Sequence, residues 1–149
     1  MIKTLIVVPM KNLSVSKTRL AGTLSNSARA RLVRLLYQKT LNFLIPIAAK
    51  EKVEIAVVTK CKYAKDIAKK LGVRVIHEPN NLGLSAAILH SAIAAKEMGF
   101  ERLCIIPADL AAPLKSDLSA MLKSDSAVTI CPSSDLGTNA LVVSPPDII

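Results

Sequence analysis

The sequence predicts an α/β fold, a Rossmann-like three-layer sandwich around a mostly parallel β-sheet. Short apolar runs rich in β-branched residues recur along the chain, and segments with helical periodicity separate them, which is the pattern of βαβ units. Hydrophobic residues make up 51% of the 149 residues and charged residues 21%, a balance typical of a compact protein. No internal repeat, low-complexity tract or linker stands out, so residues 1–149 are expected to form a single domain.

Six apolar runs are expected to be strands, because each has the length of a strand and a high content of branched aliphatic residues. The run after Thr4 stops at a proline, as a buried strand before a loop would. The expected strands are Leu5–Val8, Val53–Thr59, Val73–His77, Leu103–Pro107, Ala127–Cys131 and Ala140–Val143.

Four segments between these runs are expected to be helices: Ser25 to about Leu44, Lys62–Leu71, Leu84–Met98 and Leu114–Leu122. Ser25 or Ser27 is a plausible N-cap of the first helix. Helical spacing gives each of the first two helices an apolar side that is expected to face inward. Gly72 is expected to cap the end of the second helix. The expected inward residues are Ala28, Leu32, Leu35, Leu36 and Phe43 in the first helix and Ala64, Ile67, Ala68 and Leu71 in the second.

The net charge of +9 favours anionic partners such as nucleotides or phosphorylated metabolites. Nucleic acid is disfavoured because aromatic residues, which stack on bases, are only 3% of the chain. The three cysteines have no C-x-x-C spacing and indicate a reduced, cytoplasmic protein. The absence of a long apolar segment argues against a membrane partner.

A basic loop follows the first expected strand. Lys11, Lys17 and Arg19 lie in it just beyond Pro9. Ligands of open α/β sheets bind beyond the carboxyl ends of the strands. We therefore expect this loop to bind an anion, most plausibly phosphate, although a solvated surface loop has the same composition.

Three further loops follow or precede expected strands at this position. Gly83, Leu84 and Ser85 open the third helix, whose amino end offers free N–H groups; an ordinary capped turn is the alternative. Asp109 follows the fourth strand and could hold Mg²⁺ beside a phosphate, or could cap the next helix. The segment from Asp135 to Ala140 enters the last strand and is, by itself, only a turn signal.

Neither G-x-x-x-x-G-K-[ST] nor G-x-G-x-x-G is present. Taken together and in order, the four loops resemble the CofC/FbiD family, the 2-phospho-L-lactate guanylyltransferases and their phosphoenolpyruvate-using relatives, which have the nucleotidyltransferase (nucleotide-diphospho-sugar transferase) fold. The resemblance spans the whole chain. The matching stretches are Pro9-x-Lys11 with Ser16–Leu20, Gly83-Leu84-x-Ala86-Ala87, Pro107–Leu110 and Asp135-x-Gly137–Leu141.

The resemblance implies GMP transfer from GTP to a small phosphorylated carboxylic acid, with pyrophosphate released, in coenzyme F-420 biosynthesis. Lys17 and Asp109 would be the catalytic residues, and Asp109 would bind Mg²⁺ as the cofactor. The residues implied to bind the nucleotide are Pro9, Lys11, Lys17, Arg19, Gly83, Leu84 and Ser85. The residues implied to bind the phosphorylated acid are Thr138, Asp135 and Asn139.

The chain departs from the family pattern in two places. The family usually has Asn at the position of Ser85, and it continues beyond Ile149 with a C-terminal segment. Two other functions therefore stay open: a related nucleotidyltransferase with another phosphorylated acceptor, and a truncated, catalytically silent nucleotide-binding module. The oligomeric state is also open, with a homodimer as one expectation.

Overall fold

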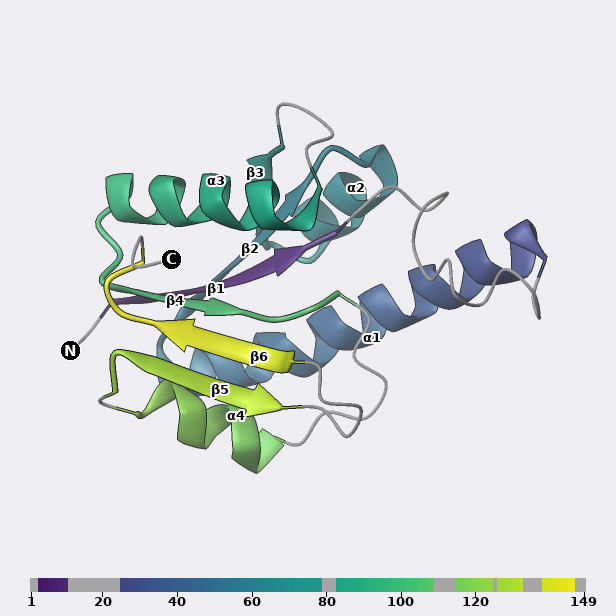
Figure 1. Cartoon of the computed structure of the whole chain (residues 1–149). Helices are drawn as coiled ribbons and strands as arrows, with labels where there is room; N and C mark the ends of the chain where they lie inside the picture. Colours follow the sequence, from purple (N-terminus) through teal and green to yellow (C-terminus); the bar gives the residue numbers. More distant parts are fainter. Residues whose placement is uncertain are drawn as a thin grey trace.

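The computed structural model has the predicted α/β architecture, with strands and helices alternating along the chain (Figure 1). It describes residues 3–10, 25–78, 83–108, 115–124, 126–132 and 138–146. The strands are β1 (Thr4–Pro9), β2 (Glu54–Thr59), β3 (Arg74–His77), β4 (Arg102–Ile105), β5 (Val128–Pro132) and β6 (Thr138–Val143). The helices are α1 (Asn26–Glu51), α2 (Lys62–Lys70), α3 (Leu84–Glu97) and α4 (Lys115–Leu122).

The strands form one six-stranded sheet in the order β3-β2-β1-β4-β6-β5. β1 pairs in parallel with β2 on one side and with β4 on the other, and β2 pairs in parallel with β3. β6 runs antiparallel to both β4 and β5. The sheet is therefore mostly parallel, as predicted, and the amino end of β6 lies at the edge where the other strands have their carboxyl ends.

Helices cover both faces of the sheet, which makes the three layers (Figure 1). Side chains of α1, α2 and α4 belong to one apolar core, and side chains of α3 belong to the other. The chain passes from β1 to β2 and β3 in one direction and then returns to β4 on the far side of β1. Right-handed crossovers in opposite directions place their helices on opposite faces.

The central strand β1 explains why its sequence is a continuous apolar run. Ile6 and Val8 pack into the core under α1, whereas Leu5 and Val7 pack into the core under α3. All four side chains have no exposed surface. A strand that is buried on both faces cannot alternate with polar residues, so its sequence loses the period of two.

Helix α1 begins as predicted but ends later. The Ser25 hydroxyl accepts a hydrogen bond from the Ala28 N–H at 3.1 Å, which confirms it as the N-cap. The helix then continues through Pro46 to Glu51, so the predicted end near Leu44 is wrong. Leu44 and Ile47 are both buried, and this continued apolar side packs the last turns against the sheet.

The predicted inward sides of the first two helices need correction at one residue each. Leu35 is 62% exposed and Leu71 is 37% exposed. The buried side of α1 instead follows Val33, Tyr37 and Leu41, which lie at spacings of four residues and are at most 2% exposed. Leu35 lies two residues from both Val33 and Tyr37, which places it on the opposite side of the helix.

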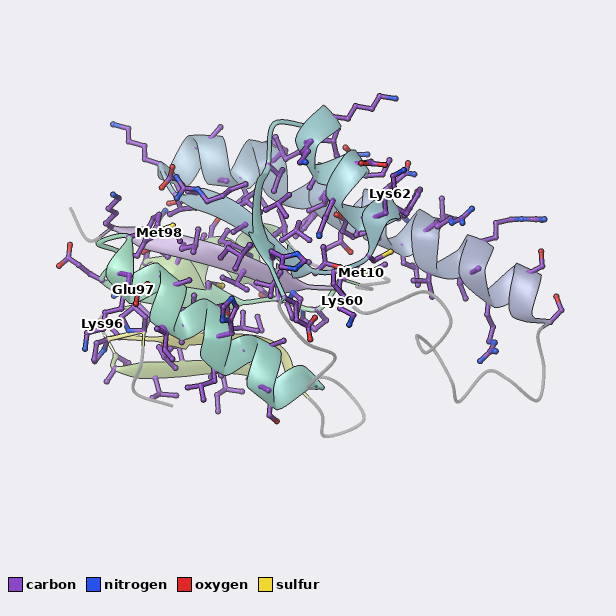
Figure 2. The ribbon with its side chains drawn as sticks, turned by 90° about the horizontal axis from the view of Figure 1, so that it is seen from above. Met10, Lys60, Lys62, Lys96, Glu97 and Met98 are labelled. Atoms are coloured by element: carbon purple, nitrogen blue, oxygen red, sulfur yellow. The ribbon has the colours of Figure 1, made fainter. Side chains whose placement is uncertain are left out.

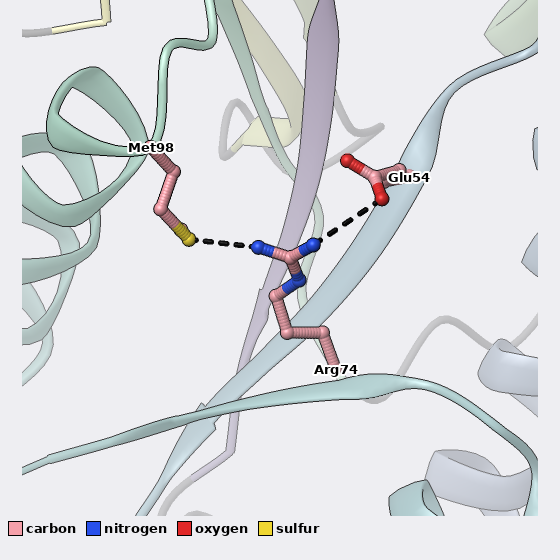
Figure 3. A network of polar contacts seen from close by, with 3 residues as sticks. All are labelled: Glu54, Arg74 and Met98. Atoms are coloured by element: carbon pink, nitrogen blue, oxygen red, sulfur yellow. Dashed lines mark hydrogen bonds and ion pairs between the residues drawn. The ribbon is translucent and has the colours of Figure 1, made fainter.

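A small polar network lies at the amino edge of the sheet, where the parallel strands begin (Figure 3). The Arg74 guanidinium lies 3.3 Å from a Glu54 carboxylate oxygen and donates to the Met98 sulfur at 2.8 Å. It also lies 5.9 Å from the centre of the Phe100 ring. These contacts join the starts of β2 and β3 to the end of α3, at the edge opposite the carboxyl ends of the strands.

Among the residues that the structure describes, none of the helices is long and apolar enough to cross a membrane.

Candidate functional site

The carboxyl ends of the parallel strands meet at one edge of the sheet, which we call the carboxyl edge. Beyond β1, the Met10 N–H donates to the Val58 carbonyl at 2.9 Å. Beyond β4, the Ile106 N–H donates to the Val7 carbonyl at 3.0 Å. Hydrogen bonding between neighbouring strands therefore continues one residue past the assigned ends of β1 and β4.

The strand order reverses between β1 and β4 at this edge. β1 leads to β2 on one side, and its other neighbour β4 comes from the opposite crossover. Both strands are followed by a connection to the same face of the sheet, since α1 follows β1, α4 follows β4, and both helices pack into the same core. The loops that begin after Met10 and after Ala108 therefore start from neighbouring strands at the carboxyl edge, where ligands of open α/β sheets bind.

The predicted site residues fall into two groups. The structure describes Pro9 at the end of β1, Gly83 and Ser85 at the start of α3, and the backbone of Leu84, Thr138 and Asn139. The other predicted site residues, Lys11, Lys17, Arg19, Asp109 and Asp135, lie outside the described residues, so their roles stay predictions.

The described members of the first group all lie at the carboxyl edge. Pro9 pairs with Val58. Thr138 begins β6 and pairs with Pro132, at the end of β5. Gly83 precedes the first residue of α3, and this helix crosses the sheet from the carboxyl edge to the amino edge (Figure 1). Residues far apart in the sequence thus come to one edge, as the parallel topology requires.

Chain continuity ties the remaining loops to the same edge. Lys11 directly follows Met10, and Asp109 directly follows Ala108. Both preceding residues are described and buried, at 3% and 7% exposed. The basic loop and the acidic loop therefore begin next to each other, at the carboxyl ends of the neighbouring strands β1 and β4.

The amino end of α3 has a conformation that glycine favours. Gly83 has φ 88° and ψ 176°, and its position as N-cap is not accompanied by a side-chain capping bond or an acidic residue in the first turn. An L-residue with a side chain is strained at this positive φ. The first N–H groups of the helix lie at the carboxyl edge, where the helix dipole favours negative charge.

Helix α2 also begins at the carboxyl edge, on the opposite face of the sheet from α3. Cys61 is its N-cap and makes no side-chain capping bond. The Cys61 N–H donates to the Thr59 hydroxyl at 3.0 Å, and Thr59 is fully buried. This contact fixes the turn from β2 into α2.

Basic side chains that are not among the predicted site residues also gather at this end of the sheet. Lys60 and Lys62 lie close to Met10, at the end of the molecule opposite Lys96 (Figure 2). The Lys65 ammonium lies 2.7 Å from Nδ1 of His77. Within the described part of the chain, none of these lysines forms an ion pair.

Glu78 is a second feature that sequence reasoning missed. Its N–H donates to the Thr59 carbonyl at 3.1 Å, one residue beyond β3, and only 7% of the residue is exposed. A glutamate before a proline in a polar loop is typically solvated, so composition alone gave no sign of burial. The available signal was its place directly after an apolar strand.

The described residues contain no group of three or more His, Cys, Asp or Glu side chains that could hold a metal ion. The predicted metal ligand, Asp109, lies outside these residues. A carboxylate is the hard oxygen donor that Mg²⁺ prefers, and the metal role of Asp109 stays a prediction.

Comparison with known proteins identifies the family. The model of the CofC-like guanylyl transferase family matches residues 4–149. The chain belongs to this family. A 3-phospho-D-glycerate guanylyltransferase from Colwellia psychrerythraea is 34% identical over 150 residues, covering 99% of this chain and 70% of the relative.

Other members of the family carry different acceptor names. A 2-phospho-L-lactate guanylyltransferase from Methanothermobacter thermautotrophicus is 29% identical, covering 96% of this chain and 63% of the relative. A phosphoenolpyruvate guanylyltransferase from Mycolicibacterium gilvum is 33% identical, covering 74% of this chain and 52% of the relative. The chain thus spans between about half and 70% of the length of these three relatives.

Solved structures confirm the predicted fold type of this CofC-like chain. A nucleotide-diphospho-sugar transferase from Desulfovibrio desulfuricans superposes with a TM-score of 0.75 at 16% identity, covering 100% of this chain and 66% of that chain. A cytidylyltransferase from Leptospira borgpetersenii gives a TM-score of 0.60 at 14% identity, covering 97% of this chain and 61% of that chain. At such low identity these likenesses establish the fold alone.

Proposed function

We propose that this chain transfers GMP from GTP to a small phosphorylated carboxylic acid and releases pyrophosphate. The observation that supports it best is the convergence at the carboxyl edge. Loops that match the family at Pro9–Leu20, Gly83–Ala87, Pro107–Leu110 and Asp135–Leu141 all begin or end at that one edge. Because a nucleotide and an acceptor must meet for transfer, elements of both predicted sites have to share an edge.

The reaction is a substitution at the α-phosphorus of GTP. A phosphate oxygen of the acceptor attacks, the bond between the α-phosphorus and the bridging oxygen breaks, and pyrophosphate leaves with the electron pair. No covalent enzyme intermediate is required, so the side chains serve to position the reactants and to offset negative charge.

Each predicted residue has a role in that scheme. Lys11, Lys17 and Arg19 would neutralise the triphosphate, with Lys17 nearest the α-phosphate. The amino end of α3 would face the nucleoside, and Thr138 with Asp135 and Asn139 would hold the acceptor. Asp109 would hold Mg²⁺, which supplies charge neutralisation of the leaving pyrophosphate when it is bound.

The acceptor is proposed as a class. The names of the relatives include 3-phospho-D-glycerate, 2-phospho-L-lactate and phosphoenolpyruvate. All three are three-carbon carboxylic acids with one phosphate, so a pocket for this class needs the same charges and the same size. With phospholactate or phosphoenolpyruvate as acceptor, the product would enter coenzyme F-420 biosynthesis.

The test is transfer of label from α-³²P GTP to each of the three acids in the presence of Mg²⁺. We expect one acid to give a labelled product together with an equal amount of pyrophosphate. Asp109→Asn should lower this rate by about 100-fold or more, since the metal contributes several kcal/mol to such reactions. Its melting temperature should stay close to that of the parent chain.

Asp66→Asn is the matched control, because Asp66 lies in α2 and outside the predicted site. Wild-type turnover in Asp109→Asn would contradict the metal role. GTP binding without transfer to any of the acids would instead favour a catalytically silent nucleotide-binding module, and tighter binding of CTP or UTP would favour a different nucleotidyltransferase.

A further inference from the structure

Strand β5 forms one edge of the sheet, and most of its length lacks the features that protect such edges. Its residues include no charged side chain, and its one proline, Pro132, stands at the carboxyl end. Val128 is 47% exposed and Ile130 is 56% exposed. Natural edge strands are usually covered, charged or interrupted, because an open apolar edge pairs readily with another chain.

The register with β6 shows which backbone groups of β5 point outwards. The Ser144 N–H donates to the Ala127 carbonyl at 2.8 Å, which extends the register of the two strands by one residue. Hydrogen-bonded and non-hydrogen-bonded pairs alternate along an antiparallel ladder, so Thr129 again bonds to β6. Val128 and Ile130 therefore direct their N–H and C=O groups away from β6. Among the described residues, no backbone group pairs with this outer row.

The same two residues present their side chains on the α3 face of the sheet. Val128 lies opposite Val143, and Ile130 lies opposite Leu141. Both partners on β6 pack into the core under α3. Helix α3 packs mainly on β1 and β4, two strands away from β5. The edge of the sheet thus combines unpaired backbone groups with apolar side chains at the same two positions.

This outer row is complementary to itself. When two copies of β5 pair antiparallel about a twofold axis at Thr129, Val128 of each copy lies opposite Ile130 of the other. Each of these two pairs exchanges both N–H···O bonds, which gives four hydrogen bonds between the copies. The pairing also places the four exposed apolar side chains side by side on one face. A twofold interface of this kind closes after two copies.

The distribution of charge also favours a second copy at this edge. Two chains that each have a net charge of +9 repel one another. The lysines of α2 lie beside β2 and β3, at the opposite edge of the sheet. The uncharged strand β5 therefore lets two copies approach while their α2 helices stay far apart.

We propose that β5 is an interface at which two copies of this chain join their sheets by antiparallel pairing about Thr129. The inference does not rest on the proposed function, because none of the predicted site residues takes part in the pairing. Four hydrogen bonds and four apolar side chains make a small interface, so the expected dissociation constant is about 1–100 µM.

The test is the molar mass of the chain in solution, measured by sedimentation velocity over concentrations that span this range. The mass of the parent chain should rise to that of two chains and no further. Ile130→Lys should weaken the association at least about tenfold, because it brings two ammonium groups into the interface. Leu35→Lys is the matched control, since Leu35 is 62% exposed on α1; it should associate like the parent chain.

Val128→Pro separates strand pairing from simple apolar contact. Proline removes an N–H that points outwards and leaves the ladder with β6 intact, as edge positions allow. The variant should also associate at least about tenfold more weakly, because two of the four hydrogen bonds are lost. Its melting temperature in dilute solution, where the parent chain is monomeric too, should stay close to that of the parent.

A cysteine on the proposed axis reports the register. Opposite residues of a non-hydrogen-bonded pair have Cα atoms about 4.5 Å apart, a distance that a disulfide can span. Thr129→Cys should therefore give a disulfide-linked dimer on mild oxidation. The controls are the parent chain with its own cysteines and Val75→Cys on β3, at the other edge of the sheet, and neither should give this product.

A parent chain that stays monomeric well above about 100 µM would overturn the inference, and would leave this edge to a strand of another partner. A dimer that persists in Ile130→Lys or in Val128→Pro, or equal weakening by Leu35→Lys, would place the interface elsewhere. Assemblies larger than two copies, or a Thr129→Cys variant that does not cross-link although the parent chain is dimeric, would contradict the twofold pairing.

Discussion

Cys104 lies in the middle of β4 with no exposed surface. Burial raises the pKa of its thiol from 9.0 to about 12, and the positive charge of Arg102 opposes part of this rise. The same cause raises the pKa of the Tyr37 phenol, which is fully buried and donates to the Ala64 carbonyl at 2.7 Å. Both groups therefore stay neutral in the folded chain when their counterparts in the unfolded chain ionise.

The raised pKa of Cys104 makes stability depend on pH in the alkaline range. Its folded pKa exceeds the unfolded one, so the folded state binds more protons between pH 9 and about 12. The contribution of this thiol to the free energy of unfolding is fully present below pH 9. It is lost as the pH rises towards 12, by at most about 1.4 kcal/mol per pH unit. Urea unfolding between pH 8.5 and 10 should show this decline.

Cys104→Ala is the comparison that isolates the thiol. It should be less stable at pH 8 because of the lost packing, but its stability should decline less steeply above pH 9. An equal slope in the two proteins would mean that the Cys104 thiol contributes nothing and that another group, such as the Tyr37 phenol, accounts for the whole decline.

At the scale of elements, α1 is the helix that least resembles its sequence prediction. Pro46 has no N–H to donate to the carbonyl four residues earlier and its ring crowds that carbonyl, which usually ends a helix before such a residue. The helix continues because the burial of Ile47 and Ala48 outweighs the local defect. The exposed position of Pro46 leaves its ring in solvent.

Replacing Pro46 by alanine should therefore stabilise the protein. The variant regains one helical hydrogen bond and loses the ring clash, a gain of about 1–2 kcal/mol after the greater entropy of the unfolded chain is subtracted. The free energy of unfolding in urea measures this gain. A loss of stability would mean that the local geometry at Pro46 is needed to bring Ile47 into the core.

The same helix shows what local sequence can and cannot predict. The cap at Ser25 was predictable, since capping depends on neighbouring residues. The exposure of Leu35 could not be predicted in this way. One side of α1 faces the sheet and α2 while the other faces solvent, and which side is buried depends on the packing of the whole fold. Leu71 was misplaced for a similar reason, since it follows the last turn of α2 and is 37% exposed.

At the scale of the whole molecule, the sheet topology brings the candidate site together. The sequence predicted parallel strands and polar loops after them, but not which strands are neighbours. The order β3-β2-β1-β4 places the basic loop after β1 next to the acidic loop after β4, and places Glu78 at the other end of the same edge. Such distant arrangements depend on crossovers and packing, which no short motif encodes.

The chain has a net charge of +9, and several of its positive side chains gather at one end of the molecule. Lys60, Lys62 and Lys65 lie towards the carboxyl edge, where α2 and α3 also begin. Helix amino ends and ammonium groups add to one positive potential, which should attract a triphosphate before any contact forms. Because exposed charges act through water, this attraction must weaken as salt is added.

Reversing the charge of Lys62 should therefore weaken GTP binding in a salt-dependent way. Lys62→Glu is expected to lower GTP affinity about five- to tenfold at about 50 mM salt and less than about twofold at about 300 mM, while a glutamate in the first turn of α2 leaves that helix stable. Lys96→Glu, the same change at the opposite end of the molecule, should have a much smaller effect at either salt concentration (Figure 2). Equal losses in the two variants would show that only the total charge matters, and a loss in Lys62→Glu that persists at high salt would indicate direct contact with the nucleotide.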